Sequence, residues 1–479
     1  MRSLMWFRSD LRTRDNTALT EACRARGGCV GVYVVSPGEW RAHDVAPVRI
    51  DFAIRTLKEL ASDLARLHIP LVIRAAPTPR EMPGVLLKLA RESGCERLFF
   101  NREHEVNESR RDEAVRLEFE REGLAVTAHD DQTILAPGRV RTQEGRPFTV
   151  FTPFKKRWLA VLDEEGGHPP LGLPARQPEV EVKPSTIPTH IEGFTSSVPP
   201  RLWPAGEAAA AARLRRFCDA AISSHKAERD LPALDSTSAL SPHLAVGSIS
   251  PRQCLAAARE GNDGKADGGK AGPAAWISEL VWREFYVHVM AAFPRVCMHR
   301  AFKPETDRVR WSDNEAHFTA WCQGRTGFPI VDAAMRQLAQ TGWMHNRLRM
   351  ITAMFLTKDL FIDWRRGERF FIQSLVDGFL ASNNGGWQWS ASTGTDAAPY
   401  FRIFNPFSQS RTCDPRGDFI RRFCPELTHL DDEQIHEPYS DKTGVPPLAR
   451  ATLDYPEPIV DHATARDRVL KAFAALRAP

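Results

Sequence analysis

The stretch SLMWFRSDLRTRDNTALTEACRARGGCVGVYVV (residues 3–35) decides the fold class. Its two ends, 3–7 and 29–35, are short apolar runs, and residues 16–26 carry apolar side chains at helical spacing. Short apolar runs bounded by polar residues and glycines are typical of buried strands, and the pattern between them is typical of a helix. This strand–helix–strand unit predicts a parallel sheet covered by helices.

The same alternation continues to about residue 135. Further strands are expected at 71–74, 97–101 and 125–129, and further helices at 49–67, 83–93 and 105–122. We therefore expect a doubly wound α/β domain over residues 1–135, with helices on both faces of the sheet. No GxGxxG string follows the first strand, so this domain lacks the phosphate-binding loop of a dinucleotide site.

The remainder of the chain has a different pattern. Residues 166–206 are rich in proline and poor in long apolar runs, which indicates a linker, and we assign 136–206 to it. Helical periodicity then dominates, so residues 207–479 are expected to form an all-α domain.

Composition limits the function classes. The chain has 479 residues, 42% of them hydrophobic and 26% charged, without an apolar run near the roughly 18 residues that span a bilayer. Its nine cysteines are scattered without a CxxC pair, which favours free thiols in a reducing, cytoplasmic compartment over a zinc site or disulfides. The net charge is only +4, so a nucleic-acid surface would have to be a local patch.

Tryptophan is concentrated in one region. Eight of the twelve tryptophans lie between Trp276 and Trp389. Core packing alone would more often use Leu, Ile and Phe, so this region favours a role for indoles beyond packing.

The segment AWISELVWREFYVHVMAAF (275–293) carries an unusual helical face. At helical spacing, one stripe is formed by Glu279, Trp282, Arg283 and Tyr286. An acid, an indole, a guanidinium and a phenol suit a pocket for a flat ligand with polar edges. The alternative is an internal Glu279–Arg283 ion pair with aromatic rings packed beside it.

A second polar face is predicted in TGWMHNRLRMITAMFLTKDL (341–360). Asn346, Arg349 and Met350 share it, whereas the core side is expected to hold Leu348, Ile351 and Phe355. An amide, an arginine and a thioether can contact a base or the edge of a flavin. The alternative is an ordinary surface helix.

The segment from 376 to 406, VDGFLASNNGGWQWSASTGTDAAPYFRIFNP, contains an Asn-Asn-Gly-Gly string at 383–386. Such a string does not continue a helix comfortably, so we expect irregular backbone there, close to another group. In that backbone Trp387 and Trp389 would point in different directions, and Asp377 is expected at the end of a helix. Farther upstream, the hydroxyl-rich run 236–241 precedes a helix and suits a pyrophosphate, although simple N-capping also explains it.

Taken together, these segments resemble the DNA photolyase/cryptochrome flavoprotein family, and most closely its bacterial class I cyclobutane pyrimidine dimer photolyases. The resemblance begins at WFRSDLR (6–12) and runs essentially to the C-terminus. It is densest in TGFPIVDAAMRQL (326–338), GWMHNRLRM (342–350) and NNGGWQWSASTGTDAAPYFRIFNP (383–406).

The resemblance implies an α/β domain, a helical domain that binds FAD, and light-driven electron transfer from reduced FAD to a dimer in DNA. Asp377 and Arg349 match an acid–base pair beside the isoalloxazine, and Asn383 matches an amide near its N5. The residues that the resemblance assigns to FAD are His225, Thr237, Ser238, Leu240, Ser241, Trp276, Arg283, Arg349, Asp377 and Asn383.

The resemblance also implies roles toward the substrate. Glu279 and Asn346 match residues that hydrogen-bond the dimer, Met350 lies beside it, and Trp282 and Trp389 match two indoles that stack on the flipped lesion. Contacts to the surrounding DNA are assigned to Arg229, Arg347 and Arg402. An electron-hopping chain from the flavin to the surface is assigned to Trp387, Trp364 and Trp311.

An antenna site for 5,10-methenyltetrahydrofolate is implied by His43, Asn107, Glu108 and Cys297. Four positions depart from the pattern of close family members. Phe379 stands in place of a second acid, His225 in place of a tyrosine, Ala239 in place of an arginine, and Met298 in place of a lysine beside the antenna cysteine.

Three alternatives are set against dimer repair. A cryptochrome is a light-sensing protein on the same fold, and signalling members often carry a long extension beyond the region that ends here at Pro479. A (6-4) photolyase would place histidine where Asn346 stands. The third alternative is an α/β nucleotide-binding protein with a helical partner domain and no photochemistry. We expect a soluble monomer that acts on UV-damaged DNA and needs no metal.

Overall fold

A five-stranded parallel sheet is formed by the N-terminal residues of the computed structural model, which describes residues 1–476. The strands are β1 (Arg2–Phe7), β2 (Cys29–Val35), β3 (Leu71–Ala75), β4 (Cys95–Asn101) and β5 (Ala125–His129). Their order is β3-β2-β1-β4-β5, and in the register Trp6 pairs with Val32 on one side and Phe100 on the other. All five expected strands are confirmed, with ends that differ by at most two residues.

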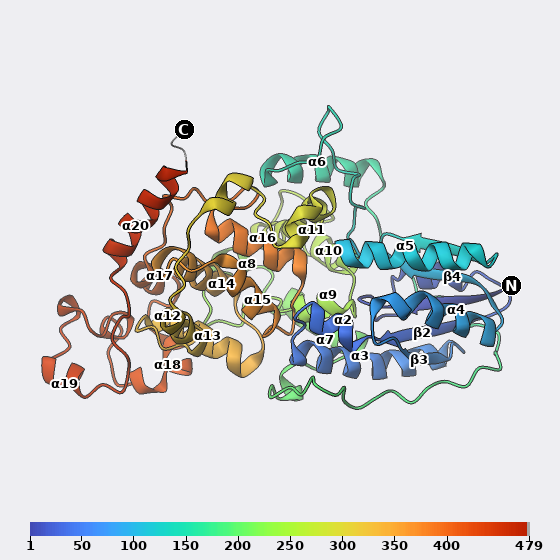
Figure 1. Cartoon of the computed structure of the whole chain (residues 1–479), viewed down its shortest axis with the longest axis horizontal. Coiled ribbons are helices and arrows are strands. Elements are labelled where there is room, and N and C mark those ends of the chain that lie inside the picture. The colour runs from blue at the N-terminus through green and yellow to red at the C-terminus, as the bar shows by residue number, and fades with distance from the viewer. Residues whose placement is uncertain (477–479) are drawn as a thin grey trace. The chain divides into compact units, whose positions relative to one another are not determined.

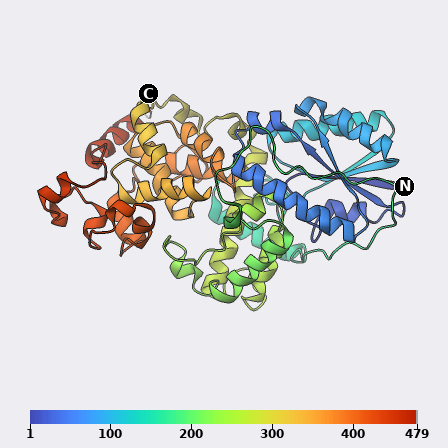
Figure 2. The same cartoon turned by 90° about the horizontal axis from the view of Figure 1, so that it is seen from below.

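Helices lie on both faces of this sheet, as Figure 2 shows in blue to cyan. The helices that connect the strands are α1 (Thr17–Ala22), α2 (Pro37–Ala42), α3 (Pro47–Arg66), α4 (Met82–Glu92) and α5 (Val106–Arg121). Side chains of α4 and α5 pack with Leu4, Trp6 and Val32 on one face. On the other face Gly31 leaves room for Phe7 and for Leu64 of α3. The doubly wound α/β fold is therefore confirmed.

The first helix is shorter than expected. The sequence predicts it over 16–26, but α1 ends at Ala22. Asn16 is its N-cap, with a side chain that accepts from the Leu19 N–H, so residue 16 lies outside the helix. At the other end Gly28 has φ of 86°, which turns the chain into β2.

Helices account for nearly all regular structure after the sheet (Figure 1). They are α6 (Phe151–Glu164), α7 (Glu207–Ala220), α8 (His225–Glu228), α9 (Ser241–Val246), α10 (Pro251–Glu260), α11 (Ala271–Ala292), α12 (Glu315–Gln323), α13 (Pro329–Thr341), α14 (Asn346–Met354), α15 (Trp364–Ile372), α16 (Leu380–Ala391), α17 (Pro406–Cys413), α18 (Asp418–Phe423), α19 (Pro447–Ala451) and α20 (His462–Ala475). A π-turn, Phe355–Asp359, extends α14. Short 3-10 turns lie at Pro79–Glu81, Pro200–Leu202, Pro294–Met298, Pro304–Arg308, Pro425–Leu427, Gln434–His436 and Asp441–Thr443.

The chain divides into two compact units. Unit 1 contains residues 1–226, 238–297 and 376–379, and unit 2 contains 227–237, 298–375 and 380–479. The proline-rich run 166–199 has no helix or strand and belongs to unit 1, where it is held by bonds such as Gln177 N–H to the Leu67 carbonyl and Ser185 N–H to the Leu71 carbonyl. Helix α6 lies within the range 136–206 that we assign to the linker. Residues 477–479, at the end of the expected all-α domain, lie outside the described residues.

The helix expected to break at the Asn-Asn-Gly-Gly string does not break. Residues 380–391 form α16 without interruption, so the expectation of irregular backbone at 383–386 is wrong. Each glycine costs about 1 kcal/mol in a helix relative to alanine, but tertiary packing can outweigh that cost. Asp377 is not at a helix end either, because α15 ends at Ile372 and Asp377 lies in the loop that follows.

Candidate functional site

The half-exposed face of α11 in unit 1 carries the predicted polar stripe. Glu279, Trp282, Arg283 and Tyr286 are each half-buried, whereas the neighbouring Leu280, Val281, Glu284 and Phe285 are buried. Other residues than those of the stripe therefore form the buried side of α11. The predicted stripe thus forms the less buried side of α11, and its role toward a ligand stays a prediction.

Arg283 is held by two contacts within unit 1. It donates a hydrogen bond to the Gln132 carbonyl at 2.7 Å, and its guanidinium lies 4.6 Å from the centre of the Phe379 ring. Burial lowers the pKa of Arg283 to about 10, so it is still charged at neutral pH. Phe379 therefore stabilises this cation through its ring face.

The hydroxyl-rich loop before α9 is tied to α7. Arg213 of α7 donates to the Ser238 carbonyl at 2.7 Å, and the Ser238 hydroxyl accepts from the Leu240 N–H at 3.4 Å. Ala239 has φ of 42°, a left-handed backbone between the two serines. Ser238 thus lies beside a guanidinium, and Ser241 is the first residue of α9; two hydroxyls and a cation of this kind fit a diphosphate.

Two further cofactor candidates meet around one phenylalanine. The rings of His225 and Trp276 lie 5.5 Å and 4.8 Å from the Phe217 ring, centre to centre, and both residues are at most 4% exposed. The structure therefore brings His225 and Trp276 into one aromatic cluster of unit 1. His225 takes part in ring packing here, which a tyrosine could also do.

Asp377 lies in a short segment that also belongs to unit 1. It is 6% exposed, and the next residue, Gly378, accepts a hydrogen bond from Arg49 of α3 at its carbonyl. Burial lowers the pKa of Arg49. The loop is thus held to α3 by a cation that is itself buried.

In unit 2, the polar face predicted from Asn346, Arg349 and Met350 lies on α14. His345 caps the helix by accepting from the Arg347 N–H, which leaves Asn346 exposed in the first turn and Met350 half-buried one turn later. Arg349 donates to the Met344 carbonyl at 2.8 Å. The expected core side is confirmed, because Leu348, Ile351 and Phe355 are at most 1% exposed.

Two of the three candidate DNA contacts lie together. Arg347 forms an ion pair with Asp230 at 2.6 Å, and Arg229 lies 4.0 Å from the same carboxylate. Two guanidinium groups thus lie close to one carboxylate in unit 2. Arg402 is exposed in the loop after α16 and is not brought to this pair.

A buried polar network that sequence reasoning missed supports α16. Asn383 donates to the Glu368 main-chain carbonyl at 3.0 Å, and Asn384 donates to the Glu368 carboxylate at 2.8 Å. Gln388 donates to Asn384 at 2.9 Å. Burial raises the pKa of Glu368 to about 7. The paired asparagines were the only signal in the sequence, and their partner lies on another helix.

The three tryptophans of the predicted hopping chain belong to one hydrophobic cluster of unit 2. Trp387 and Trp364 are buried within it, and Trp311 is partly buried at its edge, against Phe361 at 5.1 Å. Trp389 is half-buried two positions after Trp387. Positions i and i+2 of a helix point in opposite directions, so the two indoles separate as expected, although for a different reason.

Three of the four antenna candidates meet in unit 1. The His43 ring contacts Glu108 at 3.1 Å and Asn107 at 3.0 Å, and the hydrogen bond that the ring donates to the Glu108 carboxylate raises the pKa of His43. Glu39 lies in the same group, close enough for a shared cation, but Arg111 already pairs with it at 2.8 Å. Cys297 lies on the turn Pro294–Met298 and is half-buried.

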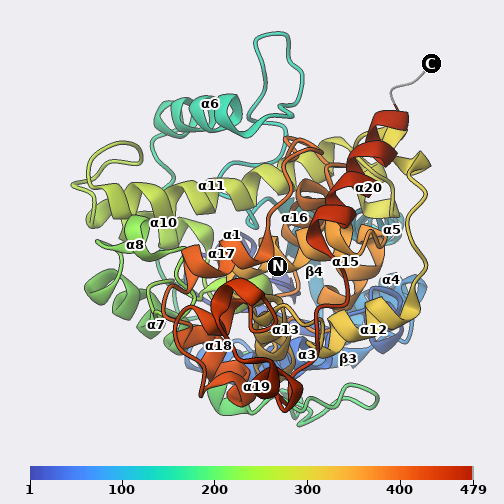
Figure 3. The same ribbon diagram turned by 90° about the vertical axis from the view of Figure 1, so that its left-hand side faces the viewer.

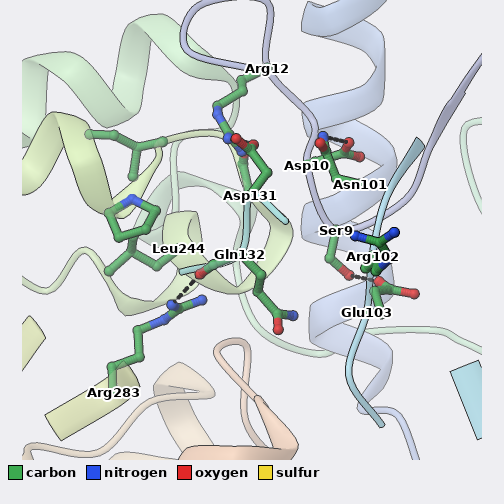
Figure 4. Close-up of a pocket in the computed structure, with 13 residues that line it drawn as sticks. Ser9, Asp10, Arg12, Asn101, Arg102, Glu103, Asp131, Gln132, Leu244 and Arg283 are labelled. Carbon is green, nitrogen blue, oxygen red and sulfur yellow. Dashed lines mark hydrogen bonds and ion pairs between the residues drawn. The ribbon is translucent and has the colours of Figure 1, made fainter. Parts of the chain in front are cut away.

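A polar pocket of unit 1 lies at the carboxyl ends of β1, β4 and β5, where strand order reverses and α/β proteins commonly bind ligands (Figure 4). Ser9 donates to Glu103 at 2.7 Å, Asn101 donates to Asp10 at 2.7 Å, and Arg12 pairs with Asp131. The room left for solvent is about 20 Å³, enough for a water molecule and too little for a flat chromophore.

Comparison with known proteins identifies the family. Residues 3–177 match the family described as DNA photolyase, and residues 276–475 match the FAD binding domain of DNA photolyase. A deoxyribodipyrimidine photo-lyase of Escherichia coli is 45% identical over 477 residues, which cover 99% of this chain and 98% of that protein. Its counterpart from Salmonella typhimurium is 46% identical over 479 residues, with the same shares covered.

Solved structures agree with the sequence relatives. The structure of a class III photolyase from Agrobacterium tumefaciens matches with a TM-score of 0.85 at 36% identity. The match covers 99% of this chain and 98% of that one. A cryptochrome from Synechocystis has a TM-score of 0.86 at 26% identity, with 98% and 99% covered. The fold alone therefore does not separate repair from light sensing. Matches of this identity and length show that the chain belongs to the DNA photolyase family and carries its FAD-binding domain.

Proposed function

We propose that this protein is a deoxyribodipyrimidine photolyase, which uses light and reduced FAD to split cyclobutane pyrimidine dimers in DNA. The observation that carries the proposal is the half-exposed stripe of α11. There Glu279 offers a carboxylate to a base edge, and Trp282 offers a flat ring within one helical turn. Identity above 40% to curated deoxyribodipyrimidine photo-lyases supports the same conclusion.

The residues present suit FAD. Ser238, tied to Arg213, and Ser241, the first residue of α9, would hold the diphosphate, with Thr237 and Leu240 beside them in the chain. His225 and Trp276 would line the cofactor with aromatic surface, and the flavin edge is assigned to Arg283, Arg349, Asp377 and Asn383. When bound in its reduced form, FAD would supply the photoexcited electron that opens the cyclobutane ring and would take the electron back after the ring has split.

The chain's own residues bind and orient the damaged bases. Among base-flipping enzymes in general, photolyases included, extruding a base costs a few kcal/mol, and least when the base is damaged. Stacking on an aromatic ring contributes about 1–3 kcal/mol per base. Trp282 and Trp389, each half-buried, therefore offer stacking of the size needed to offset that cost. Glu279, Asn346 and Met350 would select the dimer by hydrogen bonds and contact.

We also propose which residues contact the DNA backbone and where in the cell the protein acts. Arg229, Arg347 and Arg402 would contact phosphates around the lesion, which suits a protein with a net charge of only +4.

All nine cysteines are free, which supports a reducing compartment, and we place the protein in the cytoplasm as a monomer. No helix within residues 1–476 is long and apolar enough to cross a membrane.

We also propose a folate antenna at His43, Asn107 and Glu108. Their mutual hydrogen bonds form an acid–amide–imidazole group that suits the polar edge of a pterin. The pocket at the carboxyl ends of the strands is too small for a second chromophore. The purified protein should then show a folate absorption band. The variant E108Q should lose this band and keep the absorption bands of FAD, and that result would support the assignment.

The deciding experiment uses the FAD-loaded protein in its reduced form and an oligonucleotide with one thymine dimer. Incubation in blue light is expected to remove the dimer, and incubation in the dark is expected to leave it. Equal loss in both conditions, or no loss in light, would refute light-driven dimer repair, and no loss in either condition would favour the cryptochrome alternative. A (6-4) oligonucleotide is the matched substrate control, and we expect it to be unchanged because Asn346 stands where that reaction needs histidine.

A further inference from the structure

The indole of Trp282 is not alone on its helix face. Phe151, the first residue of α6, lies flat on it, with ring centres 3.7 Å apart and ring planes only 7° from parallel. Both residues belong to unit 1, where α6 runs alongside α11 (Figure 3). Phe151 is half-buried, and nothing in the sequence distinguishes it from other phenylalanines.

The stack is fixed by its surroundings. The buried Phe285 ring meets both members edge-on, at 5.9 Å from Phe151 and 5.6 Å from Trp282. One turn along α6, Phe154 packs on the same Phe285 ring at 5.2 Å. Helix α6 is itself anchored to α11, because Trp158 donates to the Glu284 carboxylate at 2.6 Å. The position of Phe151 is therefore set by the core.

The geometry of the pair differs from what ring electrostatics prefer. Aromatic pairs favour edge-to-face or offset contacts, and the contacts of Phe285 with both rings are of that kind. A centre-to-centre distance of 3.7 Å between parallel rings leaves little offset. The electrostatic attraction between the two rings is therefore weaker in this stack than in an edge-to-face or offset contact. The stack nevertheless holds the plane of the indole in a single orientation.

We propose that Phe151 is a positioning residue for lesion recognition, which backs the Trp282 indole and keeps it flat for an incoming base. The inference rests on the proposed function, because it assigns Trp282 to base stacking. A ring already held in its bound orientation loses less conformational freedom when DNA binds. Phe151 thereby strengthens binding of a flipped base, and it leaves the binding of undamaged duplex, which uses no flipped base, unchanged.

The test compares the FAD-loaded wild-type protein with F151A, F151Y and F148A in the dark. Phe148 is also half-buried and precedes α6, but its ring packs on Phe154, so F148A is the matched control. We expect F151A to bind a thymine-dimer oligonucleotide about two- to ten-fold more weakly, the range of one aromatic pair. Affinity for the undamaged oligonucleotide should not change, and F151Y and F148A should bind the dimer as the wild type does.

A purely structural role would lower the melting temperature and both affinities together. If F151A unfolds, F151L is measured instead, because it fills space without a flat ring and should show the same selective loss. Dimer binding by F151A or F151L equal to wild type overturns the inference, and tighter binding would mean that Phe151 blocks the indole. A wild-type protein without preference for the dimer would refute the proposed function itself, so the two failures are distinguishable.

Discussion

At the scale of single residues, one glycine determines where the predicted electron route can lie. Gly367 of α15 faces the Trp387 indole so closely that an added Cβ would lie 2.1 Å from the ring. Since Trp387 is 2% exposed and packed among Trp321 and Phe371, the ring has nowhere to move. Gly367 thus leaves space for the indole.

We expect G367A to destabilise the protein by about 1–3 kcal/mol, as overpacking does in a filled core. The matched control is G386A, because Gly386 lies in α16 with nothing within 4 Å of its added Cβ. That variant should be neutral or more stable by up to about 1 kcal/mol. Urea unfolding of both variants measures the difference, and equal stabilities would contradict the packing argument.

A buried glutamate predicts a pH dependence. Glu284 is 0% exposed and accepts from the Leu135 N–H and the Trp158 indole, and burial raises its pKa to about 7. A carboxyl whose pKa is raised by folding stabilises the protein below its unfolded pKa, near 4.5, and this contribution is lost as pH rises through 7.

Between pH 4.5 and 7, Glu284 should lower the free energy of unfolding by at most about 1.4 kcal/mol per pH unit. We expect E284Q to remove that part of the slope, measured by chemical unfolding at pH 5 and pH 7. E113Q, which removes an exposed glutamate of α5, should leave the slope nearly as in the wild type. An unchanged slope in E284Q would show that the carboxyl is ionised throughout this range.

At the scale of elements, α16 carries both a core residue and a residue proposed to lie near the flavin. One side carries Trp387 into the hydrophobic core, and the amides of Asn383 and Asn384 fix the helix to Glu368 of α15. These hydrogen bonds, together with the buried indole, offset the cost of two glycines in the helix. The side chain proposed to lie near the flavin is thereby oriented by a partner outside its own helix.

The proposed electron route gives a prediction at this scale. We expect W311F to slow photoreduction of oxidised flavin strongly, because Trp311 is the partly buried end of the tryptophan cluster. Repair by enzyme whose flavin is already reduced should be largely kept. The control is W321F, since Trp321 lies 6.0 Å from Trp387 but is fully buried and leads to no surface. A large loss of repair by already reduced W311F would contradict the assignment.

At the scale of the whole molecule, the proposed binding of DNA would depend on local charge. With a net charge of +4, a long-range field contributes little, and Arg229 and Arg347 beside Asp230 are the proposed phosphate contacts in unit 2. Each phosphate contact releases counterions, so affinity should fall with salt in proportion to the number of contacts.

We expect R229A to weaken binding of damaged and undamaged DNA alike and to reduce the slope of log affinity against log salt by about 1. The control R201A removes an exposed arginine elsewhere and should leave the slope as in the wild type. Titrations at several salt concentrations measure both. A selective loss for damaged DNA in R229A would assign this arginine to the lesion rather than to the phosphate backbone.

The sequence by itself determined the parallel sheet and its order of elements, because apolar runs and helical periodicity are local properties of the chain. It also determined the polar faces of α11 and α14, since side-chain spacing on a helix follows directly from residue number. Residues such as Glu279, Trp282 and Asn346 could therefore be placed on these faces from their spacing, whereas their roles toward the substrate came from the resemblance to the photolyase family.

Only the tertiary structure decided what these faces contact. The hydrogen bonds of Asn383 and Asn384 to Glu368, the cation–π contact of Arg283 with Phe379, and the stack of Phe151 on Trp282 all join residues of different elements. Local propensity favours a break at Asn-Asn-Gly-Gly, but buried hydrogen bonds and a buried indole contribute more than two glycines cost. Contacts between distant segments depend on packing, which residue spacing does not encode.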